Sequence, residues 1–282
     1  MAASEALAID RLVAADVDAG LQLSDAARWN QTAEDWAFFI AHGDAFGIRA
    51  SDDAHRPIAT AAALPYGAGV GWISMVLVDP RHRHRGHATR LLATCVDALR
   101  STGRVAVLDA TPDGAAVYRR AGFVAGFGFE RWQGDAAGTN ASSIGDVLDQ
   151  RRRDTLLALD RATSALDRSA LLGNVLARPT TRAWLGDDAS GFALLRGGRR
   201  AQQLGPIVAA DEQAAIVLLG RALDAATGAV FIDVPSRWRA LAAALVERGF
   251  ARQRPFVRMA LGATEALAAN ARVFAIAGPE FG

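Results

Sequence analysis

The sequence predicts an α/β fold with mixed sheets, divided between two related domains. Strand and helix patterns alternate through the first half, as they do in α/β domains. The second half repeats several features of the first half in the same order, which indicates a duplication. The chain has 282 residues, a length that fits two domains of about 100–200 residues each.

The elements of the first half follow from apolar periodicity and from turn residues. Helices are expected over 16–29, 32–42, 88–100 and 114–120, and strands over 46–50, 57–64, 70–78, 104–110 and 123–132. The second helix has a defined start, because Thr32 can cap it and Asp35 stands three positions later. The central strands should run parallel wherever a helix crosses over between them.

A polar stretch separates the two halves. Residues 133–144 are mainly Gly, Asp, Ala, Thr, Asn and Ser, which is the composition of a linker. We therefore predict a first domain over 1–135, a linker over 136–145 and a second domain over 146–282. The second domain should open with helices over 146–160 and 164–177, strands near 181–185, 191–195 and 202–208, and a hairpin turn at Gly197-Gly198.

The second half repeats an ordered series of first-half residues. The first-half members are Leu91-Leu92, Asp97, Thr102-Gly103, Val107-Leu108-Asp109, Pro112 and Gly122-Phe123. Their counterparts are Leu218-Leu219, Asp224, Thr227-Gly228, Phe231-Ile232-Asp233, Pro235 and Gly249-Phe250. One loop does not repeat, because residues 83–88 read Arg-His-Arg-Gly-His-Ala whereas residues 209–213 read Ala-Ala-Asp-Glu-Gln. An anion that the first loop binds should be repelled by the acidic second loop.

Composition excludes several classes of protein. The chain has no lysine, so Walker-type phosphate sites and Schiff-base or pyridoxal-phosphate chemistry are excluded. Its single cysteine, Cys95, fits a reducing compartment, and we expect it to be a buried small hydrophobic residue. A net charge of +1 argues against a general binder of nucleic acid or anionic membranes. The apolar runs fall short of the ~18 residues that a membrane span needs, and charges interrupt any N-terminal signal core, so we expect a cytoplasmic protein.

The loop before the third expected helix has the parts of a phosphate site. The unpaired N–H groups and the positive dipole end of a helix N-terminus favour phosphate. Gly86 lets the backbone approach a ligand, Ala88 does not block it, and Thr89 can donate a hydroxyl. Arg83 and Arg85 add positive charge at any physiological pH. The alternatives are a solvated basic turn, or a nucleic-acid contact whose affinity falls strongly with salt.

Two motifs in the right order resemble those of one enzyme family. Residues 76–92, with Arg83, Gly86 and Ala88 as an Arg-x-x-Gly-x-Ala loop, resemble motif A of the GCN5-related N-acetyltransferases. Residues 109–123, with Tyr118 four residues before Gly122-Phe123, resemble motif B. The likeness covers roughly residues 9–132. Residues 29–36, together with the second half, further resemble a two-domain bacterial subgroup with a degenerate second domain. This resemblance implies a tandem GNAT-like acyl-CoA N-acyltransferase fold.

The resemblance implies acetyl-CoA as co-substrate and no metal. Acetyl-CoA would thread between the strands over 70–78 and 104–110, where backbone groups of Val76 and Val78 would pair with the pantetheine and polarise the thioester. The pyrophosphate would be held by the loop residues Arg83, His84, Arg85, Gly86, His87, Ala88 and Thr89. Three histidines of this loop, His82, His84 and His87, lie beside arginines that disfavour a metal, so we interpret the loop as solvated.

Two residues are candidates for proton transfer. By the resemblance, Tyr118 would protonate the departing thiolate, and the alternative is a core aromatic under Gly122-Phe123. Asp109 is a candidate general base, because a carboxylate at the end of an apolar strand is costly unless it is paired or used. Since Asp233 repeats this feature in the second half, both aspartates could instead bond to the following turn.

The acceptor side is expected at the joint between the first two helices. Trp29, Asn30 and Gln31 form this joint, and an aromatic beside two amides suits a small polar substrate. The alternative is a role at a helix cap and core edge. We therefore expect an acetyl-CoA-dependent N-acetyltransferase that acts on the primary amine of a small molecule, with a homodimer left open. The rival is a non-catalytic acyl-CoA sensor or regulatory subunit.

Overall fold

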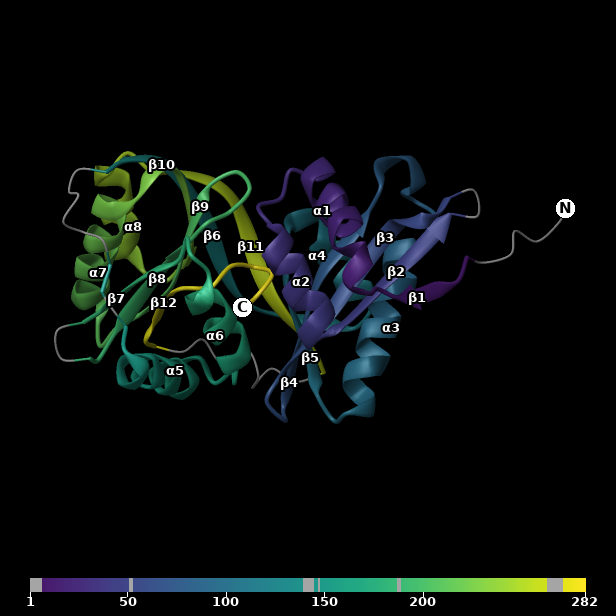
Figure 1. Cartoon of the computed structure of the whole chain (residues 1–282), viewed down its shortest axis with the longest axis horizontal. Coiled ribbons are helices and arrows are strands. Elements are labelled where there is room, and N and C mark those ends of the chain that lie inside the picture. The colour runs from purple at the N-terminus through teal and green to yellow at the C-terminus, as the bar shows by residue number, and fades with distance from the viewer. Residues whose placement is uncertain (1–6, 51–52, 139–144, 147, 187–188, 263–270) are drawn as a thin grey trace, which may run out of the picture. The chain divides into compact units, whose positions relative to one another are not determined.

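The computed structural model describes residues 7–50, 53–138, 145–146, 148–186, 189–262 and 271–282 (Figure 1). Contacts between residues divide the chain into two compact units, Met1–Ala106 and Val107–Gly282. Within the described residues, no helix is both long and apolar enough to cross a membrane.

The described residues of the first unit form an antiparallel sheet with three α-helices. In chain order its elements are β1 (Ile9–Arg11), α1 (Val17–Ala26), α2 (Ala33–His42), β2 (Asp44–Ala50), β3 (Asp53–Tyr66), β4 (Val70–Val78) and α3 (His87–Ser101). The strands lie in the order β1-β2-β3-β4, and each neighbouring pair is antiparallel. The short edge strand β1 was not expected from the sequence.

The first two helices begin and end where local side-chain chemistry requires. Thr32 caps α2: its Oγ accepts the Asp35 N–H at 3.3 Å, and the Asp35 carboxylate accepts the Thr32 N–H at 2.9 Å. This confirms the predicted capping box. Helix α1 ends at Ala26 rather than at residue 29, because Arg28 adopts a left-handed conformation with φ of 59°. The two helices pack closely, since a Cβ at Gly20 would lie 2.6 Å from the Trp36 ring.

The second unit is a mixed sheet with helices from both halves of the chain. In chain order its elements are β5 (Val105–Ala110, beginning at the end of the first unit), α4 (Pro112–Arg120), β6 (Phe123–Ala137), α5 (Gln150–Ser164), α6 (Ser169–Ala177), β7 (Arg182–Leu185), β8 (Phe192–Arg196), β9 (Gln202–Val208), α7 (Glu212–Ala225), β10 (Thr227–Pro235), α8 (Arg239–Glu247), β11 (Ala251–Leu261) and β12 (Val273–Ala275). The strands follow the order β5-β11-β6-β10-β9-β8-β7, with β12 on β9. Within the described residues, β9 and β10 pair in parallel, as expected for two strands joined by a helix.

Strands from the two halves of the chain alternate at the centre of this sheet. Strand β11 lies between β5 and β6, and β6 lies between β11 and β10. Phe129 of β6 and Phe256 of β11 are direct cross-strand partners, and their rings stack at 5.1 Å with an angle of 5°. Each half therefore completes its part of the sheet with a strand from the other half. The arrangement is symmetric about the Phe129–Phe256 pair.

The structure supports the predicted duplication. The order α3-β5-α4-β6 recurs as α7-β10-α8-β11. Glycines stand in the left-handed conformation at the same two points, with φ of 72° at Gly103 and 70° at Gly228, and of 90° at Gly122 and 81° at Gly249. Because L side chains rarely adopt these angles, both turns depend on glycine.

The linker expected over 136–145 begins later than the sequence indicates. Residues 136 and 137 belong to β6, where Ala137 pairs with Thr227 and Ala136 with Gly228. Residues 139–144 lie outside the described residues. Helix α5 begins at Gln150 instead of residue 146, because Asp149 caps it by accepting the Arg152 N–H at 2.8 Å. The domain ranges 1–135 and 146–282 stay a prediction. Contacts divide the chain earlier, since β5 and β6 pair with β11.

Candidate active site

Strand β4 contains a bulge next to Val76. Thr60 pairs with Leu77 and Ala62 pairs with Ser74, so Met75 and Val76 together oppose only Ala61. Met75 has a φ of 54°, and its carbonyl accepts the Thr60 hydroxyl at 3.0 Å. A bulge leaves backbone groups outside the ladder of the sheet. The backbone of Val76 is therefore available for hydrogen bonds outside the sheet. The resemblance assigns these hydrogen bonds to pantetheine.

The loop after β4 opens onto the N-terminus of α3. His84 and Gly86 are both left-handed, with φ of 62° and 78°, and Gly86 takes the N-cap position. A Cβ built on Gly86 would meet no atom within 4 Å, so the space beside the first turn is open. The N–H groups in the first turn of a helix have no partner within the helix. In α3 these groups lie next to the open space, so they are candidates to bind an anion.

The arginines of this loop differ in their surroundings. Arg81 binds Asp79 through Nη2 at 3.0 Å and Nε at 3.2 Å, and these hydrogen bonds lower the pKa of Asp79 to about 2. Arg83 and Arg85 are exposed, and each donates to a backbone carbonyl at 3.4 Å. Arg81 is thus neutralised by Asp79. Arg83 and Arg85 form no ion pair within the described part of the chain, so they bring positive charge to the loop.

The equivalent helix N-terminus in the second half carries its own acids. Asp211 caps α7 and accepts the Ala214 N–H at 2.8 Å. The neighbouring Glu212 carboxylate accepts the Leu241 N–H of α8 at 2.9 Å. A carboxylate therefore occupies the position that a phosphate would need, which agrees with the asymmetry inferred from the two loops.

A segment near the end of the chain fills the space between β9 and β10. These strands pair only over residues 202–204 and 230–232. Beyond that point β12 pairs with Ile207 and Val208, and the Ile276 N–H donates to the Asp233 carbonyl at 3.0 Å. A Cβ at Gly205 would collide with the Ile276 carbonyl oxygen, so the segment packs tightly against β9. The second half thus fills with its own backbone the interval between strands that the resemblance assigns to pantetheine in the first half.

Tyr118 lies on α4, whose start Thr111 caps by accepting the Gly114 N–H at 3.3 Å. The side chain is half-buried, and its ring centre lies 6.0 Å from that of Phe123. A Cβ at Gly114 would approach the ring to 3.0 Å, so the small residue one turn earlier leaves room for it. The counterpart four residues before Gly249 is Leu245, which is fully buried. A phenol is present at this position only in the first half.

Asp109 is held by an arginine from the other half of the chain. Arg258 of β11 donates through Nε and Nη2 to both Asp109 oxygens at 2.9 Å. Arg131 of β6 holds Asp233 in the same way at 2.8 Å. In both pairs the two residues are direct cross-strand partners. The duplication has therefore produced two matched, buried ion pairs on either side of the Phe129–Phe256 stack.

This geometry favours a structural role for Asp109. Burial raises the pKa of Asp109, while the charge of Arg258 opposes the increase. Both carboxylate oxygens already accept hydrogen bonds, and Asp233 is bound by an arginine in the same way in the half with the filled interval. The hydrogen-bond partner of Asp109 is therefore Arg258, which is distant in sequence. The alternative from the sequence was a bond to the turn that follows Asp109. The general-base role of Asp109 stays a prediction.

The expected acceptor residues lie at the joint before α2. Asn30 and Gln31 are buried, and Trp29 is half-buried. The backbone N–H of Trp29 donates to the Ser24 carbonyl at 2.9 Å. The Gln31 Oε1 atom is buried without a hydrogen-bond partner among the described residues. A buried carbonyl without a donor is costly, so Gln31 is a candidate to accept a hydrogen bond from a ligand.

His87 is buried, although we expected the loop histidines to be solvated. Neither ring nitrogen has a hydrogen-bond partner within the described part of the chain. Burial, followed by the charge of Arg90, lowers the pKa of His87 below 6.5. The first residue of α3 is therefore a neutral imidazole at neutral pH. Sequence reasoning missed this, because an isolated histidine gives no signal of burial.

Burial of His87 makes stability depend on pH. Below pH 6.5 the unfolded chain binds a proton that the folded chain does not, until the lowered pKa of His87 is reached. The free energy of unfolding should therefore decrease as pH falls through this window, and His87 should contribute no change above it. A His87→Leu variant should lose this part of the decrease in urea unfolding at about pH 7.5 and about pH 5.5. An unchanged decrease would contradict the assignment.

Two further expectations concern Cys95 and metals. Cys95 is fully buried on α3, and burial raises the pKa of its thiol, which confirms its interpretation as a small core residue. Among the residues that the structure describes, no group of three or more His, Cys, Asp or Glu is placed to hold a metal ion.

Two family models match the chain, one in each half. A model of the acetyltransferase (GNAT) family matches residues 16–123, and a model of an acetyltransferase (GNAT) domain matches residues 156–275. Together these ranges cover most of the sequence. The chain belongs to the GNAT superfamily and carries two GNAT domains in tandem. Acyl transfer from an acyl-CoA is the general activity of this family.

Solved structures share the fold over nearly the whole chain. A Pyrococcus horikoshii protein assigned to the acetyltransferases is 17% identical with a TM-score of 0.80, covering 100% of this chain and 98% of that one. A tandem GNAT protein from the clavulanic acid biosynthesis pathway is 17% identical with a TM-score of 0.61, covering 90% and 98%. A GCN5-related N-acetyltransferase from Sphaerobacter thermophilus is 15% identical with a TM-score of 0.59, covering 90% and 95%. No curated protein matches the chain.

Proposed function

We propose that the chain is an acetyl-CoA-dependent N-acetyltransferase that acts on the primary amine of a small molecule, and that only its first half binds acetyl-CoA. The main support for this proposal is the contrast between two equivalent helix N-termini. That of α3 is open beside Gly86, whereas Asp211 caps that of α7 with a carboxylate. Family membership supports acyl transfer in general. The contrast supports one cofactor site per chain.

The first half offers a group for each demand of the reaction. The amine nitrogen attacks the thioester carbon, the C–N bond forms, and the C–S bond then breaks. The oxyanion formed on the way needs a fixed donor, and the bulged backbone at Val76 supplies a candidate. The departing thiolate needs a proton, which Tyr118 would donate. The amine loses a proton to a base, for which a water molecule is an alternative to the ion-paired Asp109.

The acceptor amine is placed beside Gln31 in this proposal. Its Oε1 atom is buried without a partner among the described residues, and a neutral amine carries the N–H donors that would satisfy it. Asn30 is buried next to it, and Trp29 is half-buried. Trp29, Asn30 and Gln31 together would orient the amine.

A Tyr118→Phe variant tests the enzymatic role. We expect kcat to fall by about 100-fold, because a general acid contributes about 10²–10⁴-fold. The Kd for acetyl-CoA should stay within about twofold, since the ring is retained. The measurement pairs release of CoA thiol, over a panel of amines, with calorimetric titration of acetyl-CoA. Tyr66→Phe is the matched control, because Tyr66 is the other tyrosine of the chain.

The rival proposal is a non-catalytic acyl-CoA sensor. It predicts tight binding of acetyl-CoA by the wild-type protein with no CoA released by any amine in the panel. If amines do release CoA but Tyr118→Phe does not change kcat, the acetyltransferase proposal stands without Tyr118 as its acid.

A further inference from the structure

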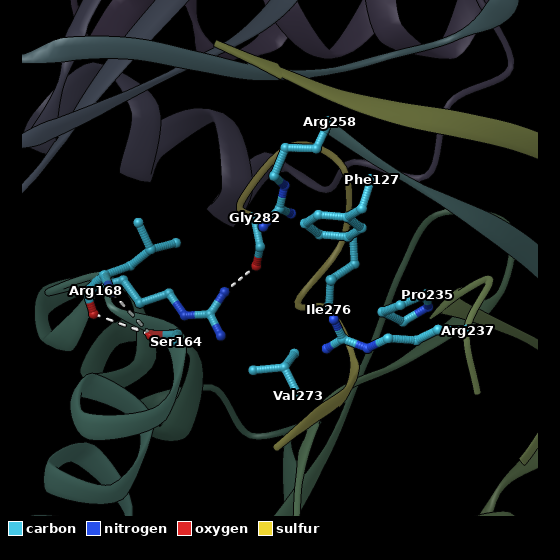
Figure 2. Close-up of a pocket in the computed structure, with 10 residues that line it drawn as sticks. Phe127, Ser164, Arg168, Pro235, Arg237, Arg258, Val273, Ile276 and Gly282 are labelled. Atoms are coloured by element: carbon cyan, nitrogen blue, oxygen red, sulfur yellow. Dashed lines mark hydrogen bonds between the residues drawn. The ribbon is translucent and has the colours of Figure 1, made fainter. Parts of the chain in front are cut away.

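Two arginines that line a small cavity in the second unit are bound by other groups of the chain. Figure 2 shows the Gly282 carbonyl accepting a hydrogen bond from Arg168, and Asp109 binds Arg258 through both of its oxygens. The first unit contains a contrasting group, because both ring nitrogens of His87 are buried without a hydrogen-bond partner among the described residues. A leucine would fill such a position without the cost of two unsatisfied polar atoms, so packing alone does not account for a histidine there.

His87 is the first residue of α3, directly after the N-cap Gly86. Its backbone N–H is one of the first-turn groups beside the open space, whereas the residue as a whole is only 7% exposed. An anion bound at this N–H would lie within about 8 Å of the ring, because both groups belong to one residue. The equivalent first residue of α7 is Glu212, whose carboxylate accepts the Leu241 N–H at 2.9 Å. An open first turn beside a buried imidazole is therefore a feature of α3 and not of α7.

The charges that act on the His87 ring disfavour its protonation. Burial, followed by nearby positive charges, lowers the pKa of His87 below 6.5. These charges come from Arg90 on α3 and from His82 and Arg85 of the preceding loop. Arg90 donates to the Leu7 carbonyl at 2.6 Å, a contact that leaves its charge in place. In the free protein the ring is therefore neutral at neutral pH.

The strands packed against α3 do not supply a balancing acid. These strands are β2, β3 and β4, and residues 57–65 of β3 and 70–78 of β4 carry no ionisable side chain. Asp44 of β2 binds Arg11, and its charge acts on Cys95 further along α3. Asp79 after β4 binds Arg81 through both oxygens. A pyrophosphate at the first turn of α3 would thus bring to the ring the negative charge that these described residues do not provide.

We propose that binding of acetyl-CoA at the first turn of α3 is coupled to uptake of a proton by His87, so that the loop binds acetyl-CoA more tightly at mildly acidic pH. The inference rests on the proposed function, in which this loop holds the pyrophosphate. The proton comes from solvent and adds to the unprotonated ring nitrogen, and no bond of acetyl-CoA changes. The negative charges of the pyrophosphate favour the imidazolium. By linkage, the imidazolium favours the bound pyrophosphate to the same extent.

Titration of the His87 ring by NMR tests the coupling directly. The Cε1–H resonance of His87, assigned by its loss in His87→Leu, should titrate below pH 6.5 in the free protein. With saturating acetyl-CoA, we expect its titration to move up by about one pH unit or more, because an opposite charge nearby typically shifts a pKa by this amount. The exposed His84 of the same loop is the reference, and its titration should move less because solvent screens its charge. An unchanged titration of His87 in the complex would overturn the proposal.

Calorimetric titration with acetyl-CoA separates failure of this proposal from failure of the proposed function. At about pH 6, binding enthalpies in MES and in bis-Tris, which differ in ionisation enthalpy, give the number of protons taken up. The wild type should take up about half a proton more than His87→Leu, because the ring changes from mostly neutral to mostly charged. Between about pH 8 and about pH 5.5, its affinity should gain about tenfold over that of His87→Leu, the equivalent of one pKa unit. The phosphates of acetyl-CoA titrate in both proteins, so their contribution cancels in the comparison.

His84→Asn is the matched control, because asparagine tolerates the left-handed φ of 62° at this position. It should keep the part of the proton uptake that His87→Leu loses. If acetyl-CoA binds but His87→Leu takes up as many protons as the wild type, the coupling is wrong and the proposed function stands. Uptake that is lost in His84→Asn and kept in His87→Leu would likewise overturn the assignment to His87. If the wild type binds no acetyl-CoA, the proposed function fails, and the coupling with it.

Discussion

An Arg258→Leu variant should lose about 3–5 kcal/mol of unfolding free energy, the cost of leaving a buried carboxylate without its partner. Asp109 is fully buried in its side chain, and Arg258 supplies the hydrogen bonds to both of its oxygens. Urea unfolding, monitored by far-UV circular dichroism, measures the loss. The Asp109→Leu/Arg258→Leu double variant should lose much less than the sum of the two single variants, because it removes both charges together.

The Arg131–Asp233 pair in the second half allows the same experiment to be repeated. Arg131→Leu should also be strongly destabilising, since Asp233 is equally buried and Arg131 donates to both of its oxygens. The loss should be somewhat smaller than for Arg258→Leu, because Gln203 still donates a hydrogen bond to Asp233 at 3.0 Å. Arg252→Leu is the control on the same strand as Arg258. Arg252 is exposed and lies over the Trp132 ring at 5.3 Å, so this variant should lose no more than about 1 kcal/mol of unfolding free energy.

A further variant, Asp109→Asn, decides between the two roles of Asp109. A structural aspartate predicts that Asp109→Asn lowers the free energy of unfolding while kcat of the folded fraction stays close to wild type. A general base predicts a large fall in kcat and in the dependence of kcat on pH, with a smaller effect on stability. A result of the second kind would overturn the structural assignment.

Features set by neighbouring residues were predictable from the sequence. The capping box of Thr32 and Asp35 depends on residues three positions apart, and the structure contains both of its hydrogen bonds. The loop at Gly86 and the repeated turns at Gly122 and Gly249 likewise depend on backbone conformations that glycine favours. Features of this kind depend on residues that are close together in the sequence, so they can be predicted from short sequence patterns.

Features set by distant residues were not predictable. Asp109 and Arg258 are 149 residues apart, and their contact exists because β11 enters between β5 and β6. The sequence shows that a carboxylate in an apolar strand needs a partner, but not which of many arginines provides it. Residues 273–276 give no sign that they fill the interval beside β9. Burial of His87 and Gln31 also depends on packing that no local pattern encodes.

A Gly86→Asp variant should weaken acetyl-CoA binding by about 2–3 kcal/mol, or about 30- to 150-fold, the range for a lost hydrogen bond to a charged group. The substitution gives α3 the acidic residue that precedes α7 in the second half. Aspartate tolerates left-handed backbone better than most residues, so the φ of 78° at Gly86 should not prevent folding. Its carboxylate would lie beside first-turn N–H groups and repel the pyrophosphate. Calorimetric titration with acetyl-CoA measures the affinity, and the unfolding free energy checks the fold.

The reciprocal variant is the matched control. Asp211→Gly removes the cap of α7 and should lower stability by about 1 kcal/mol, yet acetyl-CoA should bind as in the wild type. It should not create a second site, because residues 273–276 still occupy the interval between β9 and β10. One acetyl-CoA per chain is therefore expected in the wild type and in this variant. Two bound molecules in the wild type, or equal losses of affinity from both substitutions, would show that the two helix N-termini do not differ in the way that their residues indicate.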